Sequence, residues 1–169
     1  MEERRVRGAT LDDARWIVAL SARVQESLTA SGSRQQIGPL LLESTERSIL
    51  VGNAFVLETA ERHIGSVLVD PLDHSYLVQW GLHSLSGPLW YLHSLMIEPE
   101  EQGKRLGLIF LEEVKRLMAP LSGTIVLDCW AGNAKLRDFY HRAGFTCHGI
   151  FPVKDYEVAV FIFSLTPCL

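Results

Sequence analysis

Glycines and basic residues are concentrated where one predicted element ends and another begins, in Gln102, Gly103, Lys104, Arg105, Leu106 and Gly107. Apolar residues recur at helical spacing over 106–118, so a helix is expected to begin directly after the basic residues. A helix N-terminus presents backbone N–H groups without intrahelical acceptors and the positive end of the helix dipole. Gly103 and Gly107 leave room for an anion beside the main chain, and Lys104 and Arg105 add positive charge. The pattern predicts a binding site for a phosphate group.

Two common nucleotide-binding motifs match this stretch poorly. A nucleoside triphosphate loop needs Ser or Thr after Gly-Lys to bind magnesium, whereas Arg105 follows Lys104 here. A dinucleotide fingerprint would need a third glycine and an acidic ribose ligand at spacings that this chain lacks. A loop whose glycines serve only the turn, and whose basic side chains are solvated, stays open as an alternative.

A second segment, residues 133–145, also has the features of a helix. Asn133 is a good N-cap residue, and Gly144 is suited to a left-handed C-cap. An apolar stripe at helical spacing contains Leu136, Phe139, Tyr140 and Ala143. Tyr140 is therefore either a core aromatic on this stripe or a phenol with a chemical role.

Together, and in this order, the two segments resemble the GNAT superfamily of acetyl-CoA-dependent N-acyltransferases. The loop pattern of that family is Gln or Arg, two residues, Gly, one residue, then Gly or Ala; Gln102 and Gly107 match it, and Arg105 stands at the usual middle glycine. The segment from Asn133 through Tyr140 to Phe145 is similar to the family's Asn…Tyr…Gly-Phe segment after its fifth strand. Two matching segments are more specific than either one alone.

The resemblance implies direct transfer of an acetyl group from acetyl-CoA to an amine in a ternary complex, without a metal. It assigns the backbone amides of Met96 and Ile97 to the thioester carbonyl, and Tyr140 to the departing thiolate. His93 becomes the candidate base for the amine, because family members often place a histidine or carboxylate on this strand; residues 93–97 resemble those of arylalkylamine N-acetyltransferases. A strand histidine that merely packs or faces solvent is the alternative.

The resemblance also gives a set of expected acetyl-CoA contacts. The set is Leu95, Met96, Ile97, Gln102, Gly103, Lys104, Arg105, Leu106, Gly107, Asn133, Leu136 and Tyr140.

Composition narrows the possible partners. The 169 residues include 16 Lys and Arg against 20 Asp and Glu, a net charge of −4 that argues against a nucleic-acid-binding protein. Cys129, Cys147 and Cys168 lack the short spacings of zinc or redox sites, which favours a reducing, cytoplasmic setting. Apolar runs are much shorter than the roughly 20 residues that span a bilayer. A small-molecule or peptide amine is the expected partner, and the family makes a homodimer possible.

The order of predicted elements indicates a single GNAT-like domain over residues 1–169. Its class is α/β (α+β), with a mixed, mostly antiparallel twisted sheet of six to seven strands flanked by about four helices. Strands are predicted at 5–9, 54–59, 64–69, 89–97, 124–130, 145–151 and 157–165. Helices are predicted at 11–29, 39–49, 106–118 and 133–143, and a mobile or strand-extending insertion at 70–88.

The acceptor-binding part matches no motif. One candidate set is aromatic, namely Tyr76, Trp80, Trp90 and Trp130, which line a pocket or simply pack against strands. Another is acidic, namely Asp70, Asp73, Asp155 and Glu157, which attract a cationic amine or belong to an ordinary acidic surface. A non-catalytic module that binds or senses acyl-CoA is the second functional class that the sequence permits.

Overall fold

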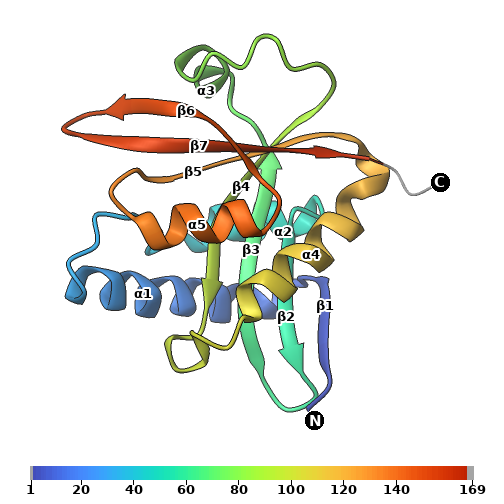
Figure 1. The fold of residues 1–169 in the computed structure, drawn as a ribbon. Coiled ribbons are helices and arrows are strands. Elements are labelled where there is room, and N and C mark those ends of the chain that lie inside the picture. The colour runs from blue at the N-terminus through green and yellow to red at the C-terminus, as the bar shows by residue number, and fades with distance from the viewer. Residues whose placement is uncertain (1, 167–169) are drawn as a thin grey trace. The chain divides into compact units, whose positions relative to one another are not determined.

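The computed structural model describes residues 2–166 of the chain (Figure 1). Its strands are β1 (Arg4–Gly8), β2 (Ala54–Thr59), β3 (His63–Pro71), β4 (Leu89–Ile97), β5 (Gly123–Trp130), β6 (Thr146–Val153) and β7 (Tyr156–Leu165). Its α-helices are α1 (Ala14–Ala30), α2 (Leu42–Leu50), α3 (His74–Gln79), α4 (Leu106–Met118) and α5 (Ala134–Arg142). Short 3-10 helices are η1 (Leu11–Asp13), η2 (Pro99–Glu101) and η3 (Ala119–Leu121).

The strands follow the order β1-β2-β3-β4-β5-β7-β6 in one mixed sheet. β4 and β5 are parallel, whereas β1–β2, β2–β3, β5–β7 and β6–β7 are antiparallel. The predicted class and the mostly antiparallel sheet are confirmed. The predicted bounds of β4 and α4 agree with the structure, and most other ends shift by one to a few residues.

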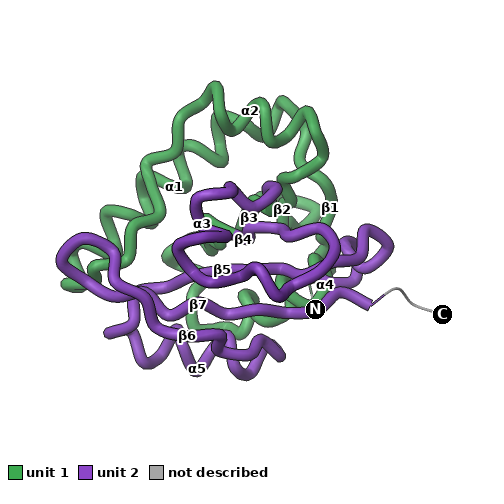
Figure 2. Tube along the Cα trace, turned by 90° about the horizontal axis from the view of Figure 1, so that it is seen from above, with its two compact units in different colours: residues 1–69, 93–114 green, residues 70–92, 115–169 purple. Residues whose placement is uncertain are grey.

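The described chain divides into two compact units, coloured separately in Figure 2. Unit 1 contains residues up to Val69 together with His93–Val114, and unit 2 contains Asp70–Leu92 together with the residues from Lys115 onward. The two halves of β4 therefore belong to different units. A single domain over 1–169 stays a prediction.

In unit 1, α1 and α2 pack against β2 and β3. Helix α1 contributes Ile17, Leu20 and Val24, which are buried in one apolar cluster with Val56 and Leu68. Their i, i+3, i+7 spacing places them on one face of the helix. This buried face explains why the amphipathic pattern in the sequence predicted the helix correctly.

A charged network holds the N-terminal elements of unit 1 together. Asp13, whose side chain is 5% exposed, accepts the Thr10 N–H at 2.7 Å in a capping box at the start of η1. Arg7 donates to Asp13 at 2.8 Å and to Glu58 at 2.9 Å, so β1 is tied to η1 and to β2. Hydrogen bonding to Arg7 lowers the pKa of Glu58 to about 2.

The lowered pKa of Glu58 predicts a specific loss of stability in acid. Folding favours the ionised carboxylate, so its contribution is complete above the ordinary pKa of 4.5 and disappears as the pH falls toward 2. Glu58→Gln should lower the free energy of unfolding at pH 7 by about 2 kcal/mol and flatten its pH dependence across this window. Urea denaturation at a series of pH values measures both effects. Glu61→Gln, at an exposed hairpin position, is the control, and equal slopes in the two variants would contradict the prediction.

Unit 2 buries apolar side chains on both faces of β5 and β7. The facing pair Leu127 and Phe161 lies on one face, where the Tyr140 ring of α5 is 5.7 Å from that of Phe161. Val126 and Val160 lie in a separate cluster, which includes Trp80 from the segment after α3. Because strand side chains alternate, α5 and the α3 segment cover opposite faces.

The predicted insertion over residues 70–88 extends β3 as far as Pro71, which agrees with the strand-extending interpretation, but it also contains a helix that the sequence did not predict. The segment contains a fifth α-helix, α3, which Asp73 caps: the Asp73 carboxylate accepts the Ser75 N–H at 2.8 Å and the Ser75 hydroxyl at 2.6 Å. Trp80 and Leu82, at 1% and 0% exposure, fix the segment in the core. Pro71 and Gly81, which are residue types common in loops, flank this short helix, so the sequence pattern did not predict it.

A buried lysine closes the end of α5. Lys115 Nζ donates to the Ala143 carbonyl at 2.6 Å and lies 4.4 Å from the centroid of the Phe163 ring. Gly144 follows with a φ of +88°, which confirms the predicted left-handed C-cap. The side chain thus satisfies a helix-end carbonyl in an apolar setting.

Replacing Lys115 by Met should therefore destabilise the protein by about 2 kcal/mol, because the Ala143 carbonyl would lose its donor. Chemical denaturation measures the change. Lys135→Met, at an exposed position of α5, should alter stability by less than about 0.5 kcal/mol. Similar losses in the two variants would show that the hydrogen bond contributes little.

Cys129 and Cys147 are free thiols, and Cys168 lies outside the described residues. Within residues 2–166, no helix is both long and apolar enough to cross a bilayer. Over the same residues, no group of three His, Cys, Asp or Glu side chains is arranged to hold a metal ion.

Candidate functional site

Strand β4 carries the residues predicted to border the acyl group, and its backbone is irregular there. Ser94 has a φ of +54°, in the left-handed region that is rare inside a strand. His93 is half-buried, and its Nδ1 lies 3.1 Å from Ser94 Oγ. The Met96 side chain is buried in the unit 1 core, while Leu95 and Ile97 are half-buried. Met96 and Ile97 therefore offer backbone groups, not side chains, for chemistry.

Gly65 on β3 permits a close approach to this part of β4. A Cβ at Gly65 would lie 2.6 Å from the Met96 carbonyl oxygen and 2.8 Å from Ile97 Cδ1. Any side chain here would push the end of β4 away. Glycine inside a strand pattern often marks such a close approach, so Gly65 was the signal for it in the sequence.

Gln102, the first predicted site residue of the loop after β4, links this loop to the strand. The Gln102 side-chain amide donates to the Ile97 carbonyl at 3.2 Å, and the Gln102 N–H donates to the Pro99 carbonyl at 3.4 Å. Gly103 has a φ of +85°, and Arg105 has a φ of +61°. Two left-handed residues therefore turn the chain into α4.

This turn leaves the amides at the start of α4 without partners. Among residues 2–166, no acceptor is found for the N–H groups of residues 103–108, and the first helical bond runs from the Ile109 N–H to the Arg105 carbonyl at 3.3 Å. No atom lies within 4 Å of a Cβ at Gly103, so the main chain is accessible there. Free donors, a helix N-terminus and open space fit a phosphate or pyrophosphate group.

The two basic residues of the loop are not equivalent. Lys104 Nζ is 2.8 Å from a carboxylate oxygen of Glu101, whose side chain is 8% exposed and which also pairs with Arg62. Arg105 is exposed and has no ion-pair partner in the part of the chain that the structure describes. The positive charge of Lys104 is thus offset by Glu101, and that of Arg105 is available. The sequence had indicated that both residues add positive charge, without a difference between them.

Helix α5 carries the predicted phenol in unit 2. Asn133 Oδ1 accepts the Leu136 N–H at 3.0 Å, so Asn133 caps the helix as expected. Tyr140 is 6% exposed, and its ring packs against Phe145 and Phe161. Burial raises the pKa of Tyr140, so its hydroxyl stays protonated. Across residues 2–166 this hydroxyl has no hydrogen-bond partner, which leaves its proton available to another molecule.

The predicted site residues thus fall into two groups. Unit 1 contains the first group, which is His93, Leu95, Met96, Ile97 and the loop from Gln102 to Gly107. In this group the Gln102 side-chain amide links the loop to β4. Unit 2 contains the second group, which is Asn133, Leu136 and Tyr140. In this group the Asn133 side chain accepts the Leu136 N–H.

Unit 2 also contains a polar pair that the sequence did not predict. The Tyr91 hydroxyl donates to Asp128 Oδ1 at 2.5 Å. The Tyr76 ring stacks on Trp80 and lies 5.3 Å from the Tyr91 ring. A single charged residue inside the apolar run of β5 was the available signal for Asp128.

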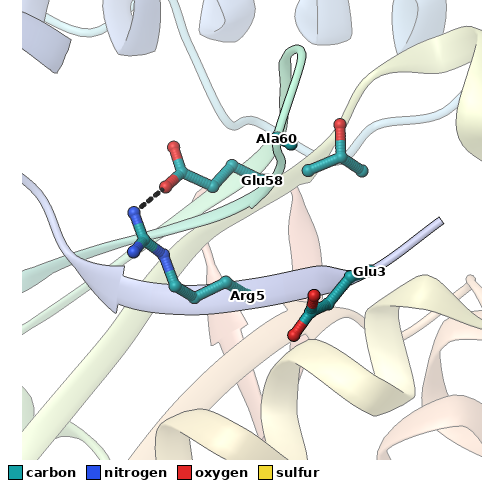
Figure 3. Close-up of a pocket in the computed structure, with 5 residues that line it drawn as sticks. Glu3, Arg5, Glu58 and Ala60 are labelled. Carbon is teal, nitrogen blue, oxygen red and sulfur yellow. Dashed lines mark hydrogen bonds and ion pairs between the residues drawn. The ribbon is translucent and has the colours of Figure 1, made fainter.

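A surface groove in unit 1 contains none of the predicted residues. It is lined by Glu3, Arg5, Glu58, Thr59 and Ala60 at the β1 edge of the sheet (Figure 3). Arg5 donates to Glu58 at 2.6 Å, and Glu58 also binds Arg7. These charges hold β1 to β2, so the groove is not our candidate for the acyl site.

Residues 23–145 match the sequence model described as the acetyltransferase (GNAT) family. The chain belongs to the GNAT acetyltransferase family. This agrees with the loop, with the Asn133–Phe145 segment and with the element order. No curated protein sequence gives a significant match.

Solved structures share the fold at low sequence identity. A GNAT acetyltransferase from Listeria monocytogenes 4b F2365 has a TM-score of 0.79 and 23% identity, with 97% of this chain and 96% of that chain covered. One from Streptococcus agalactiae 2603 has a TM-score of 0.76 and 18% identity, with 95% of each chain covered. The Salmonella typhimurium protein yncA, solved with its cofactor acetyl-CoA, has a TM-score of 0.71 and 16% identity, with coverages of 99% and 96%.

The left-handed φ of Arg105 predicts how this position responds to substitution. Arg105→Gly should be as stable as the wild type or about 1 kcal/mol more stable, because glycine adopts this conformation without strain. Arg105→Val should be less stable than Arg105→Gly by about 2 kcal/mol, because a β-branched side chain is strained there. Urea denaturation gives both values. The same Gly and Val pair at Lys104, whose φ is not left-handed, is the control; equal differences at the two positions would refute the prediction.

Proposed function

We propose that this protein transfers an acetyl group from acetyl-CoA directly to a primary amine within a ternary complex. The observation that carries the proposal is the row of free N–H groups over residues 103–108, beside the unpaired charge of Arg105. These groups suit the pyrophosphate of coenzyme A. Membership of the GNAT family and the acetyl-CoA complex of yncA support the same cofactor.

The end of β4 supplies the groups that would polarise the thioester carbonyl. Negative charge develops on that oxygen during attack, and backbone N–H groups fixed in a sheet stabilise it without reorganising. Met96 and Ile97 are assigned this role. Two features of the strand support this assignment, because both set the path of β4 here. Ser94 has a left-handed backbone conformation, and Gly65 packs against the Met96 carbonyl.

Tyr140 is assigned to the departing thiolate because it occupies the family's tyrosine position. Its raised pKa makes full proton transfer to a thiolate unfavourable, since the conjugate thiol has a pKa of about 8.5. The phenol therefore acts mainly by donating a hydrogen bond as charge builds on sulfur. Its lack of a partner within residues 2–166 is consistent with this role.

His93 is assigned to the amine. An alkylamine with a pKa of about 10.4 needs roughly 4 to 5 kcal/mol to lose its proton at pH 7, so a base accelerates the reaction. The half-buried imidazole of His93 can accept this proton directly or through a water.

Thiol release from acetyl-CoA, measured across a panel of alkylamines, antibiotics and peptides, tests the proposal. Tyr140→Phe should lower kcat about 10- to 100-fold and leave the Kd for acetyl-CoA unchanged, because only the hydroxyl is removed. His93→Ala should lower the rate of acetyl transfer to alkylamines at pH 7, and this rate should recover partly at higher pH. Tyr156→Phe, a hydroxyl deletion on β7, is the matched control and should retain activity.

A non-catalytic acyl-CoA-binding module is the second candidate, and the observation in its favour is Arg105 at the usual middle glycine. Calorimetric binding of acetyl-CoA with no transfer to any acceptor would support it and refute catalysis. The amine acceptor, a homodimer and a cytoplasmic setting stay predictions.

A further inference from the structure

A mostly buried carboxylate lies directly before the loop that carries the free amides. Glu101 is the last residue of η2, and only 8% of its side chain is exposed. Its N–H donates to the Glu98 carbonyl at 2.8 Å, and the Glu98 N–H donates to the Ile64 carbonyl at 2.8 Å, so the backbone of η2 is tied to β3. A fixed negative charge beside a loop that is suited to anions opposes the binding of an anion there.

The two carboxylate oxygens of Glu101 bind different cations. Oε1 accepts from Arg62, whose carbonyl accepts the Thr59 N–H at 2.9 Å in the turn between β2 and β3. Oε2 accepts from Lys104 Nζ at 2.8 Å. Hydrogen bonds from Lys104 and Arg62 lower the pKa of Glu101, so the carboxylate stays ionised at neutral pH. Because Arg62 occupies one oxygen, the other is oriented toward Lys104.

The ammonium group of Lys104 can reach more than one partner. Its side chain is 56% exposed and ends in a flexible four-carbon stem. No atom lies within 4 Å of a Cβ at the preceding Gly103, so a phosphate has room beside the main chain. Glu101 and a bound phosphate therefore compete for the same positive charge.

We propose that Glu101 restrains anion binding at this loop, because it holds Lys104 and withholds one of the two basic charges from the pyrophosphate of coenzyme A. The inference rests on the proposed function and adds a regulation of its cofactor site. Glu101 is a positioning residue, because it acts through Lys104. The anion is then bound by backbone N–H groups and by Arg105, which limits affinity and favours the release of coenzyme A after transfer.

Calorimetric titration of coenzyme A, and separately of inorganic pyrophosphate, into Glu101→Gln tests the inference. We expect the variant to bind each anion about fivefold more tightly than the wild type at low ionic strength, because Lys104 becomes free to contact phosphate. The gain should shrink to less than about twofold near 1 M salt, where the Debye length is about 3 Å.

Glu100→Gln is the matched control, because it removes the same charge from the neighbouring residue of η2. The Glu100 side chain is 72% exposed, and its carboxylate lies 3.5 Å from Arg62. Its substitution should change the Kd for either anion by less than about twofold. An equal gain in Glu100→Gln and Glu101→Gln would show a general effect of charge and overturn the inference.

A double-mutant cycle shows whether the gain comes through Lys104. In a Lys104→Met background, Glu101→Gln should improve binding by less than about twofold, since no ammonium is left to release. A full gain that persists in this background would refute the inference.

An unchanged or weaker affinity of Glu101→Gln, at the melting temperature of the wild type, would show that Glu101 only supports the loop and would overturn the inference. Should this variant fail to fold, Lys104→Met and Arg105→Met decide. A loss of affinity at least about threefold greater for Arg105→Met supports the inference, and equal losses refute it.

The same titrations separate this inference from the proposed function. Tighter binding by Glu101→Gln without acetyl transfer by the wild type would support the inference and refute the function. Acetyl transfer by the wild type with no gain in Glu101→Gln would refute the inference alone. Absence of binding of both anions to the wild type would refute both.

Discussion

The candidate site depends on the way the chain turns into α4. A helix must begin with several N–H groups that have no acceptor inside the helix. Here the left-handed conformations of Gly103 and Arg105 leave these groups without a protein partner across the described residues. Another turn, or a side-chain cap, would have used the same donors internally. The anion-binding role proposed for this turn therefore rests on backbone conformation first and on charge second.

The rest of unit 1 holds this turn in place. Gln102 ties the loop to the last residue of β4, and Glu101 binds both Arg62 and Lys104. Arg23 on α1 binds Glu98 at 2.6 Å, just before η2. Each interaction restrains residues that flank the free amides. Such preorganisation lowers the entropic cost of binding.

Unit 2 keeps polar groups inside an apolar framework. Lys115 closes α5 through the Ala143 carbonyl, which steadies the helix that carries Tyr140. On the other face, Asp128 is held by Tyr91 beside stacked aromatic rings. The lysine satisfies a carbonyl at a helix terminus, whereas the carboxylate accepts a hydrogen bond from a neighbouring strand.

Local patterns in the sequence determined the elements, because amphipathic spacing, caps and breakers act over a few residues. The bounds of β4 and α4, the cap at Asn133 and the left-handed Gly144 all follow from such short-range rules. Tertiary structure alone decided which distant side chains meet. Glu101 offsets the charge of Lys104 and also pairs with Arg62 some forty positions earlier, and Tyr91 reaches Asp128 across neighbouring strands. The burial of Trp80 likewise depends on packing against β5 and β7, which lie much later in the sequence, so no local pattern could predict it.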